Sequence, residues 1–345
     1  MKQLVWVRQS ILPAALLLAA LFILPMAVVQ PRLMGVELHA GRESGEARDV
    51  PLVEKTEEPQ HMIRVMHREE VQTMLFSDYL AGVLRAEMPA TFELEALKAQ
   101  AVAARTYTLY KIGNGGNHGA DADICTNPSC CQAYTDRETA WVNWGSSAER
   151  CEEKIERAVE ETQDQVLLYE GEPILAVFHA ASSGVTRPAD AVWSQDLPYL
   201  QPVASPEPKE HIPNYYSRVE FSTEDFGNLV RSAYGAASLG GDKKTWITDA
   251  VVDEAGNVET VVVGGVRMKG AALRTLLGLR SACFTWEIQE NRVVFFVTGY
   301  GHGVGLSQYG ANQMAKDGAD WKEILAHYYT GVSIGTYRFT NAAQA

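Results

Sequence analysis

The sequence lacks basic runs, internal repeats and the standard nucleotide-binding motifs, and these absences narrow the possible functions. No Lys- or Arg-rich run follows the N-terminus, and 43 acidic against 30 basic side chains give a formal charge of −13 over 345 residues. Nucleic-acid binding requires a basic surface, so this class is excluded. The glycine-rich segment 298–311, TGYGHGVGLSQYGA, contains neither G-x-G-x-x-G nor a following Gly-Lys-Ser/Thr, which excludes the common phosphate-binding loops.

An uncharged, mostly apolar run from Ile11 to Val29 follows Lys2 and Arg8. A run of roughly 20 residues is long enough to cross a bilayer. A cleaved signal peptide is the alternative, but its apolar core is usually about 7–15 residues and a small-x-small cleavage site should follow. We therefore expect residues 1–30 to form a cytoplasmic tip and a transmembrane anchor, with the remainder of the chain outside the cell membrane.

Residues 31–61 carry many charges, no aromatic residues and no sustained periodicity, so we expect a disordered tether. Beyond it, MIRVM and VQTML predict two strands around a polar turn. A helix capped by Ser77 or Asp78 should end at Glu87, because the residue after Glu87 precedes a proline.

The rest of the chain alternates between helical and strand patterns. Further elements are predicted as follows: helices at 93–112 and 149–163, a hairpin around Glu170 and Gly171, a strand–turn–strand and short helix within 246–278, a buried strand RVVFFV at 292–297, and a last helix with Asp320 and Glu323 in capping-box spacing.

This pattern predicts an α+β fold with a two-lobed ectodomain, since the chain is longer than one typical domain. Residues 62–204 and 290–340 should form the main, catalytic domain. Residues 205–289 change in character and should form a smaller inserted α+β unit.

Glu87 is a candidate catalytic acid. A carboxylate in the last turn of an apolar helix meets the negative end of the helix dipole, and shielding by Met88, Pro89 and Phe92 would raise its pKa further. A carboxylic acid that stays protonated near neutral pH suits the protonation of a glycosidic oxygen. An exposed residue at a helix end is the alternative interpretation.

Two cations on the next helix, Lys98 and Arg105, are seven residues apart and share one face, where they could bind polar or anionic substrate groups. Surface pairing with Glu93 and Glu95 is the alternative. In the glycine-rich segment, the glycines at 299, 301, 303 and 305 should let the backbone lie close to a ligand and present His302, Ser307 and Gln308 into a groove. A buried, satisfied His302 is the alternative.

Three of the five cysteines lie close together: Cys125, Cys130 and Cys131, with His118 upstream. They supply enough ligands for a tetrahedral zinc site, although the spacing is not a standard one. Disulfides within this group, or to Cys151 or Cys283, are the alternative outside the cytoplasm, but the odd number of cysteines favours a metal.

Three long segments together resemble the SpoIID family of stage II sporulation proteins, in the same order along nearly all of the chain after the tether. They are YLAGVLRAEMPATFELEALKAQAVAARTY at 79–107, FHAASSGVTRPADAVWSQDLPYLQPVASP at 178–206, and GYGHGVGLSQYGANQMAKDGADWKEILAHYYTG at 299–331.

The resemblance implies a membrane-anchored lytic transglycosylase that cuts peptide-stripped peptidoglycan glycan strands during engulfment, from the mother-cell membrane. The family's catalytic glutamate matches Glu87 in EMP. The implied partners are the amidase SpoIIP and the membrane protein SpoIIM. Motif position suggests which residues hold the glycan: Lys98, Arg105, Tyr134, Ser182, His302, Ser307 and Gln308.

The resemblance also implies a zinc site, since clostridial members of the family bind zinc through a His and Cys segment between the second and third helices. Here His118, Cys125, Cys130 and Cys131 are the expected ligands of a structural zinc, with Cys130 standing where a histidine is expected. The alternatives in function are a zinc-dependent peptidoglycan hydrolase or amidase that uses His179, His302 or His327, and a non-catalytic glycan-binding scaffold.

Overall fold

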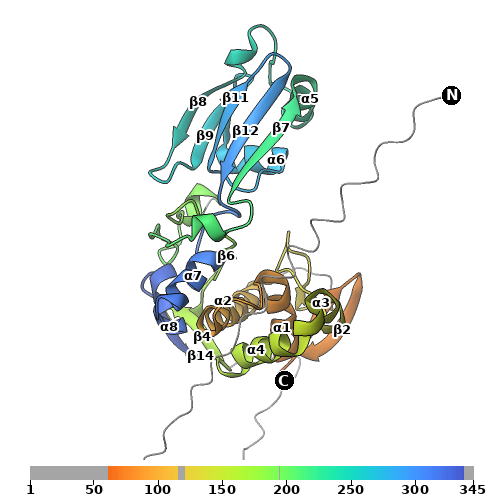
Figure 1. Ribbon diagram of the computed structural model, residues 1–345, viewed down its shortest axis with the longest axis vertical. Coiled ribbons are helices and arrows are strands. Elements are labelled where there is room, and N and C mark those ends of the chain that lie inside the picture. Colours follow the sequence, from red (N-terminus) through yellow and green to blue (C-terminus); the bar gives the residue numbers. More distant parts are fainter. Residues whose placement is uncertain (1–60, 116–120, 194, 338–345) are drawn as a thin grey trace, which may run out of the picture. The chain divides into compact units, whose positions relative to one another are not determined.

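The computed structural model describes residues 61–115, 121–193 and 195–337, which form a mixed α+β fold as predicted (Figure 1). The expected anchor and tether lie outside the described residues, as does His118. Within the described ranges, no helix combines the length and the apolar character needed to cross a bilayer.

The helices and strands alternate along the chain. The α-helices are α1 (Phe76–Glu87), α2 (Leu94–Gly113), α3 (Arg137–Trp144), α4 (Ala148–Glu160), α5 (Thr223–Ala233), α6 (Gly270–Leu277), α7 (Gln308–Lys316) and α8 (Trp321–Tyr328). The strands are β1 (Met62–His67), β2 (Glu70–Leu75), β3 (Ile124–Cys125), β4 (Gln165–Tyr169), β5 (Glu172–Pro173), β6 (Phe178–His179), β7 (Tyr216–Ser222), β8 (Ile247–Val252), β9 (Val258–Val263), β10 (Val266–Lys269), β11 (Phe284–Ile288), β12 (Arg292–Thr298), β13 (Leu306–Ser307) and β14 (Ser333–Thr336).

The first hydrophobic cluster is built around α2. This helix is rich in alanine and is buried on most of its circumference, where it contacts α1, α4, α7, α8 and β4. Small side chains let neighbouring helices approach closely, which explains why a helix without a one-sided apolar stripe lies at the centre. Glu87 at the end of α1 and Gln308 at the start of α7 are thereby fixed on two neighbours of the same helix.

The second hydrophobic cluster contains two three-stranded sheets, ordered β11-β12-β7 and β10-β9-β8, with helices α5 and α6 packed on them (Figure 1). Strand β12 lies in the middle of its sheet and buries Val293, Phe295 and Val297. The main domain expected from the sequence included this strand. The strand packs in the second cluster instead, because both of its edges pair with strands of that cluster.

Most predicted elements are present, and two differ. Helix α1 begins after Leu75 without a side-chain cap, so neither Ser77 nor Asp78 caps it. The main-chain N–H of Phe76 bonds to the carbonyl of His61, which reduces the need for a cap. Helix α3 was not predicted, and Ala140 is its one buried residue. The capping box of Asp320 and Glu323 is confirmed.

Candidate active site

Glu87 is the last residue of α1, and its position follows from the burial of that helix. Residues 79–84 are buried against the first cluster, and Met88 then turns into an extended conformation with φ −124° and ψ 141°. The extended backbone before Pro89 ends the helix. The Glu87 side chain is therefore held at a rigid junction.

The Glu87 carboxyl is partly buried and accepts two hydrogen bonds. The main-chain N–H of Ala133 donates to Oε1 at 2.9 Å, and Gln308 Nε2 lies 3.4 Å from Oε2. Burial raises the pKa of Glu87 above its usual value, although both hydrogen bonds act in the opposite direction by favouring the carboxylate. The raised pKa expected from the sequence is thus found, with burial as its main cause.

A cavity of about 670 Å³ opens beside Glu87. Its walls combine aromatic, aliphatic and polar side chains, namely those of Tyr107, Tyr110, Lys111, Pro128, Ser129, Cys130, Cys131, Gln132, Leu175, Val177, Phe178, Trp193, Gln195, Leu197 and His302. An apolar cleft with a few polar groups is typical of a ligand-binding site. Glu87 is the single carboxylic acid among the described residues that line it.

His302 lies in this cavity as a neutral imidazole. Its Nδ1 accepts a 3.1 Å hydrogen bond from the N–H of Val304, so Nε2 carries the proton in the neutral ring. Burial lowers the pKa of His302 well below its usual range, and His179, at a ring-centroid distance of 5.6 Å, adds to this effect. The ring of Trp193 packs against the His302 ring, with 5.2 Å between the two ring centroids.

The glycines of the loop before α7 have a different role from the one expected. All four have positive φ, from 70° to 115°. A Cβ at Gly305 would lie 2.1 Å from the carbonyl oxygen of Val177, and one at Gly299 would lie 2.9 Å from that of Ala181. Glycine is required because the loop packs closely on the main chain of residues 177–182. The close approach seen here is between two segments of the protein, whereas the sequence led us to expect an approach to a ligand.

Ser182 and Ser307 lie in a buried network away from Glu87. Their hydroxyls donate to Glu207 Oε1 at 2.8 and 2.6 Å, and Ser205 Oγ donates to the same atom at 2.9 Å. Neither Ser182 nor Ser307 lines the cavity beside Glu87. The network fastens the chain before β7 to the start of α7, which places Gln308 next to Glu87.

Lys98 and Arg105 also lie outside the cavity. Lys98 forms ion pairs with Glu95 at 2.8 Å and with Glu161 at 2.7 Å. The alternative interpretation, in which Lys98 pairs with carboxylates, therefore applies, although Glu161 takes the place expected for Glu93.

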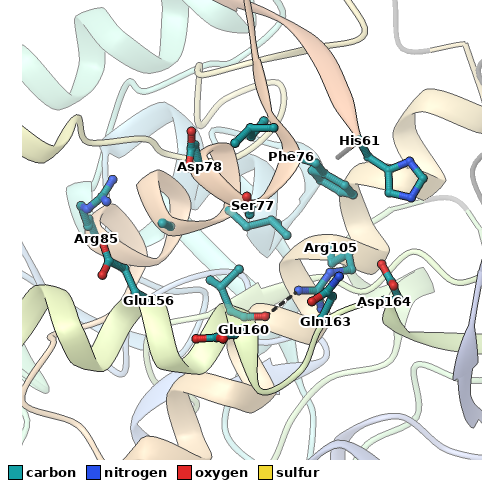
Figure 2. Close-up of a pocket in the computed structure, with 14 residues that line it drawn as sticks. His61, Phe76, Ser77, Asp78, Arg85, Arg105, Glu156, Glu160, Gln163 and Asp164 are labelled. Carbon is teal, nitrogen blue, oxygen red and sulfur yellow. Dashed lines mark hydrogen bonds between the residues drawn. The ribbon is translucent and has the colours of Figure 1, made fainter. Parts of the chain in front are cut away.

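Arg105 is buried and donates to the carbonyls of Val159, Thr162 and Gln165. It borders a different cavity of about 400 Å³, where its guanidinium bonds the last turn of α4 (Figure 2). Glu87 does not line that cavity, so the structure does not bring Arg105 together with the candidate acid.

Tyr134 packs against α1. A Cβ at Gly82 would lie 2.1 Å from its ring, so the glycine makes room for it, and the ring stacks on Tyr79 at 6.0 Å. Tyr134 does not line the cavity beside Glu87.

The sulfur atoms of Cys125, Cys130 and Cys131 lie within 4.8 Å of one another, and those of Cys130 and Cys131 are 3.9 Å apart. Tetrahedral zinc with Zn–S bonds of about 2.3 Å separates its sulfur ligands by roughly 3.8 Å. The three thiols therefore fit zinc. Cys151 and Cys283 form no disulfide.

A short segment connects this cysteine cluster to Glu87. Cys131 belongs to the cluster, and Gln132 is buried with its Nε2 donating to Thr108 Oγ1 at 2.9 Å. Ala133 then donates its N–H to Glu87. The cluster is thus separated by a single residue from the N–H that bonds the candidate acid.

Sequence analysis did not identify several cavity residues: Tyr107, Tyr110, Lys111, Gln132 and Trp193. The spacing of Tyr107 and Tyr110 on α2 placed both on one helix face, which was the available signal. The hydrogen bond from Ala133 to Glu87 is donated by a main-chain N–H, so no pattern of side chains in the sequence could predict it.

Comparison with known proteins identifies the family. A family model described as SpoIID, stage II sporulation protein, matches residues 66–169. Stage II sporulation protein D of Bacillus amyloliquefaciens is 37% identical over 265 residues, covering 76% of this chain and 75% of the relative. That of Bacillus subtilis is 36% identical over 267 residues, covering 77% and 76%.

A more distant relative is a Bacillus subtilis protein named amidase enhancer, which is 28% identical over 307 residues and covers 75% of this chain and 40% of that protein. The coverage and identity of the sporulation proteins are sufficient to assign the family. The chain belongs to the stage II sporulation protein D (SpoIID) family.

Proposed function

We propose that this protein is a lytic transglycosylase that cleaves peptide-stripped peptidoglycan glycan strands during engulfment in sporulation. The observation that carries the proposal is the Glu87 carboxyl, which has a raised pKa and lies in the wall of an aromatic cleft. A general acid for a glycosidic oxygen needs this combination of a retained proton and access to a ligand.

In this mechanism Glu87 acts twice. It first donates its proton to the oxygen between N-acetylmuramic acid and N-acetylglucosamine. Oε2 is the more available oxygen for that proton, since its contact with Gln308 is long, at 3.4 Å. The carboxylate, stabilised by the Ala133 N–H, then takes the proton from the muramic acid 6-hydroxyl as this attacks C1, and a 1,6-anhydro ring forms.

The presence of a single carboxylic acid among the described residues that line the cleft favours this reaction over hydrolysis by two carboxylates. Glycoside hydrolases generally place two carboxyl groups about 5–10 Å apart. Glu87 has no acidic companion among the described residues that line the cleft. An internal hydroxyl nucleophile needs one group that serves as acid and then as base, which supports the transglycosylase reaction.

The cleft offers surfaces suited to sugar rings. Trp193 is 37% exposed and can pack against the apolar face of a sugar. The neutral His302 supplies a polar contact without charge. Of the seven residues first suggested to hold the glycan, we retain His302 as a direct contact, while Gln308 is buried and acts through its bond to the Glu87 carboxyl.

We further propose that zinc, held by Cys125, Cys130, Cys131 and His118, is structural. Bound zinc would fix the 125–131 turn and thus the Ala133 N–H. With four protein ligands, no coordination position remains for a catalytic water, which disfavours the zinc hydrolase.

The cellular setting is also a proposal. We infer that residues 1–30 anchor the protein in the mother-cell membrane and that the described residues face the peptidoglycan. The expected partners are the amidase SpoIIP and the membrane protein SpoIIM, and the similarity to a protein named amidase enhancer supports a link to amidases. We further infer that the second hydrophobic cluster is a smaller unit inserted into the catalytic one, which gives a two-lobed ectodomain.

The test is a comparison of Glu87→Gln with Glu153→Gln on peptide-free glycan strands. General acid–base catalysis contributes about 10²–10⁴-fold, so Glu87→Gln should lower anhydro-product formation by at least about 100-fold. Glu153 is exposed on α4, and its variant should retain full activity. Full activity of Glu87→Gln would exclude the mechanism, and reducing ends in the wild-type product would indicate a hydrolase.

A further inference from the structure

A second cavity adjoins the one beside Glu87. Its volume is about 610 Å³, and it shares Trp193 and His302 with the Glu87 cavity. Its other wall comes from β10 and α6 of the second cluster, including Arg267, Lys269 and Arg274. Trp193 and His302 therefore lie between Glu87 and these three cations, so that one polymer could contact both cavities.

The charge of this second cavity differs from that of the whole chain. The formal charge of the protein is −13, yet the described residues that line this cavity include three cations and no carboxylic acid. Lys269 Nζ bonds the carbonyls of Asp190 and Trp193, and Arg274 Nε bonds that of Arg280. No hydrogen bond to a described residue uses the terminal nitrogens of Arg274, which are left for a ligand.

A buried guanidinium adds to the positive potential. Arg187 is 2% exposed, and none of its three guanidinium nitrogens has a hydrogen-bond partner among the described residues. The nearest carboxylate is Asp253, at 3.5 Å from Nε. Burial is the main cause of the lowered pKa values of Arg274 and His302, and the positive charge of Arg187 adds a smaller contribution to both. An anion in the cavity would offset this repulsion.

We propose that the second cavity binds a free carboxylate on the glycan strand, namely the lactyl carboxylate of a muramic acid residue from which the stem peptide has been removed. This inference rests on the proposed function. It assigns Arg274 as the principal contact, with Arg267 and Lys269 contributing charge, and it assigns no part in proton transfer to these residues.

The chemistry of the substrate explains why such a site selects stripped strands. In an intact strand the lactyl group is joined to the peptide through a neutral amide. An amidase converts this amide to a carboxylate, which gains charge-assisted hydrogen bonds from a guanidinium. The attached peptide would also have to be accommodated beside Trp193. The cavity therefore distinguishes the product of an amidase from its substrate.

The experiment measures binding by calorimetry in the full-length Glu87→Gln protein in detergent, so that no cleavage occurs. Three defined saccharides of equal length are compared: one with free lactyl carboxylates, one with each carboxylate converted to its methylamide, and one bearing stem peptides. A charge-assisted hydrogen bond corresponds to about a tenfold change in affinity. The carboxylate form should therefore bind about tenfold more tightly than the methylamide.

Arg274→Gln should reduce this preference to near unity while leaving the methylamide affinity unchanged. The matched control is Arg231→Gln on α5, an exposed arginine that bonds Asn228 and should retain the preference. If Arg274→Gln does not fold, the exposed Arg267→Gln should show a smaller loss of the same preference. High salt should also reduce the preference for the carboxylate form over the methylamide form.

Equal binding of the carboxylate and methylamide forms would overturn the proposal, as would equal weakening of both by Arg274→Gln. Tightest binding of the stem-bearing saccharide would also overturn it, since the anion recognised would then be on the peptide. Each result is independent of the reaction catalysed, because binding is measured without turnover. Failure of the transglycosylase mechanism would instead appear in the product assay.

Discussion

The main-chain N–H of Ala133 donates a 2.9 Å hydrogen bond to Oε1 of Glu87, and Ala133 is two residues from Cys131. The cysteine cluster and the proposed catalytic acid are therefore parts of one local structure. In the proposed zinc-bound protein, the metal would fix the 125–131 turn and with it the Ala133 N–H that bonds the Glu87 carboxyl. This relationship leads to a prediction about the metal.

Replacing Cys130 or Cys131 with serine should lower bound zinc and thermal stability together. A structural zinc contributes directly to folding free energy, since its ligands are brought together by the fold. Activity should decrease as well, because the Ala133 segment loses its anchor. Zinc content by mass spectrometry and the melting temperature are the measurements.

Cys283→Ser is the matched control for that prediction, since Cys283 is partly buried, directly precedes β11 and lies outside the cysteine cluster. It should retain its zinc. Retention of zinc by both Cys130→Ser and Cys131→Ser would contradict the four-ligand assignment.

The raised pKa of Glu87 should make the wild type less stable relative to Glu87→Gln as the pH rises. The folded state holds the proton more tightly than the unfolded state does. Stability is therefore lost between the usual glutamate pKa of about 4.5 and the raised folded value, by about 1.4 kcal/mol for each tenfold difference in proton affinity. Urea denaturation of both proteins from pH 4 to 8 measures this. A difference that stays constant with pH would show that Glu87 has an ordinary pKa.

Gln308→Ala should shift the high-pH decline of activity to higher pH. Activity requires protonated Glu87, so it falls as the pH rises through the pKa of this group. The Gln308 amide favours the carboxylate, and its removal raises the pKa further. The pH dependence of kcat/KM is the measurement, and Gln313→Ala, on the exposed side of α7, is the control. A shift to lower pH would show that Gln308 does not stabilise the carboxylate.

Arg105→Ala should destabilise the protein without impairing the folded enzyme. It leaves the carbonyls of Val159, Thr162 and Gln165 without their buried donor, a change that costs about 3–5 kcal/mol. Arg157→Ala, at an exposed pair with Glu161, should cost less than about 1 kcal/mol. Unfolding free energies and the kcat of folded protein test this. A stable variant with a strongly raised KM would instead support a direct role in substrate binding.

The elements that could be predicted from the sequence are those in which local signals agree. Helix α2 has strong helix formers throughout, and the turn between β4 and β5 has Glu170 and Gly171 at positive φ, as expected for a two-residue hairpin. Helix α3 gave no such signal because it buries a single residue. The start of α1 was misplaced because a distant carbonyl, that of His61, replaces the side-chain cap.

The same limit applies to the site. Glu87 could be predicted because the end of a helix before a proline has a local signature. The separation of Lys98 and Arg105 from the cleft could not be predicted. Helix periodicity places both residues on one face of the helix but does not identify the elements that pack against that face. Their partners, Glu161 and the carbonyls in and just after the last turn of α4, are more than 50 residues away in sequence.

The most direct test of the proposed chemistry is product analysis after digestion of peptide-free glycan in water enriched in oxygen-18. Attack by the muramic acid 6-hydroxyl uses no water. The wild-type protein should therefore release 1,6-anhydro ends without the heavy isotope, and Glu87→Gln should release almost none. Reducing ends that each carry one oxygen-18 atom would contradict the account, because water would then be the nucleophile.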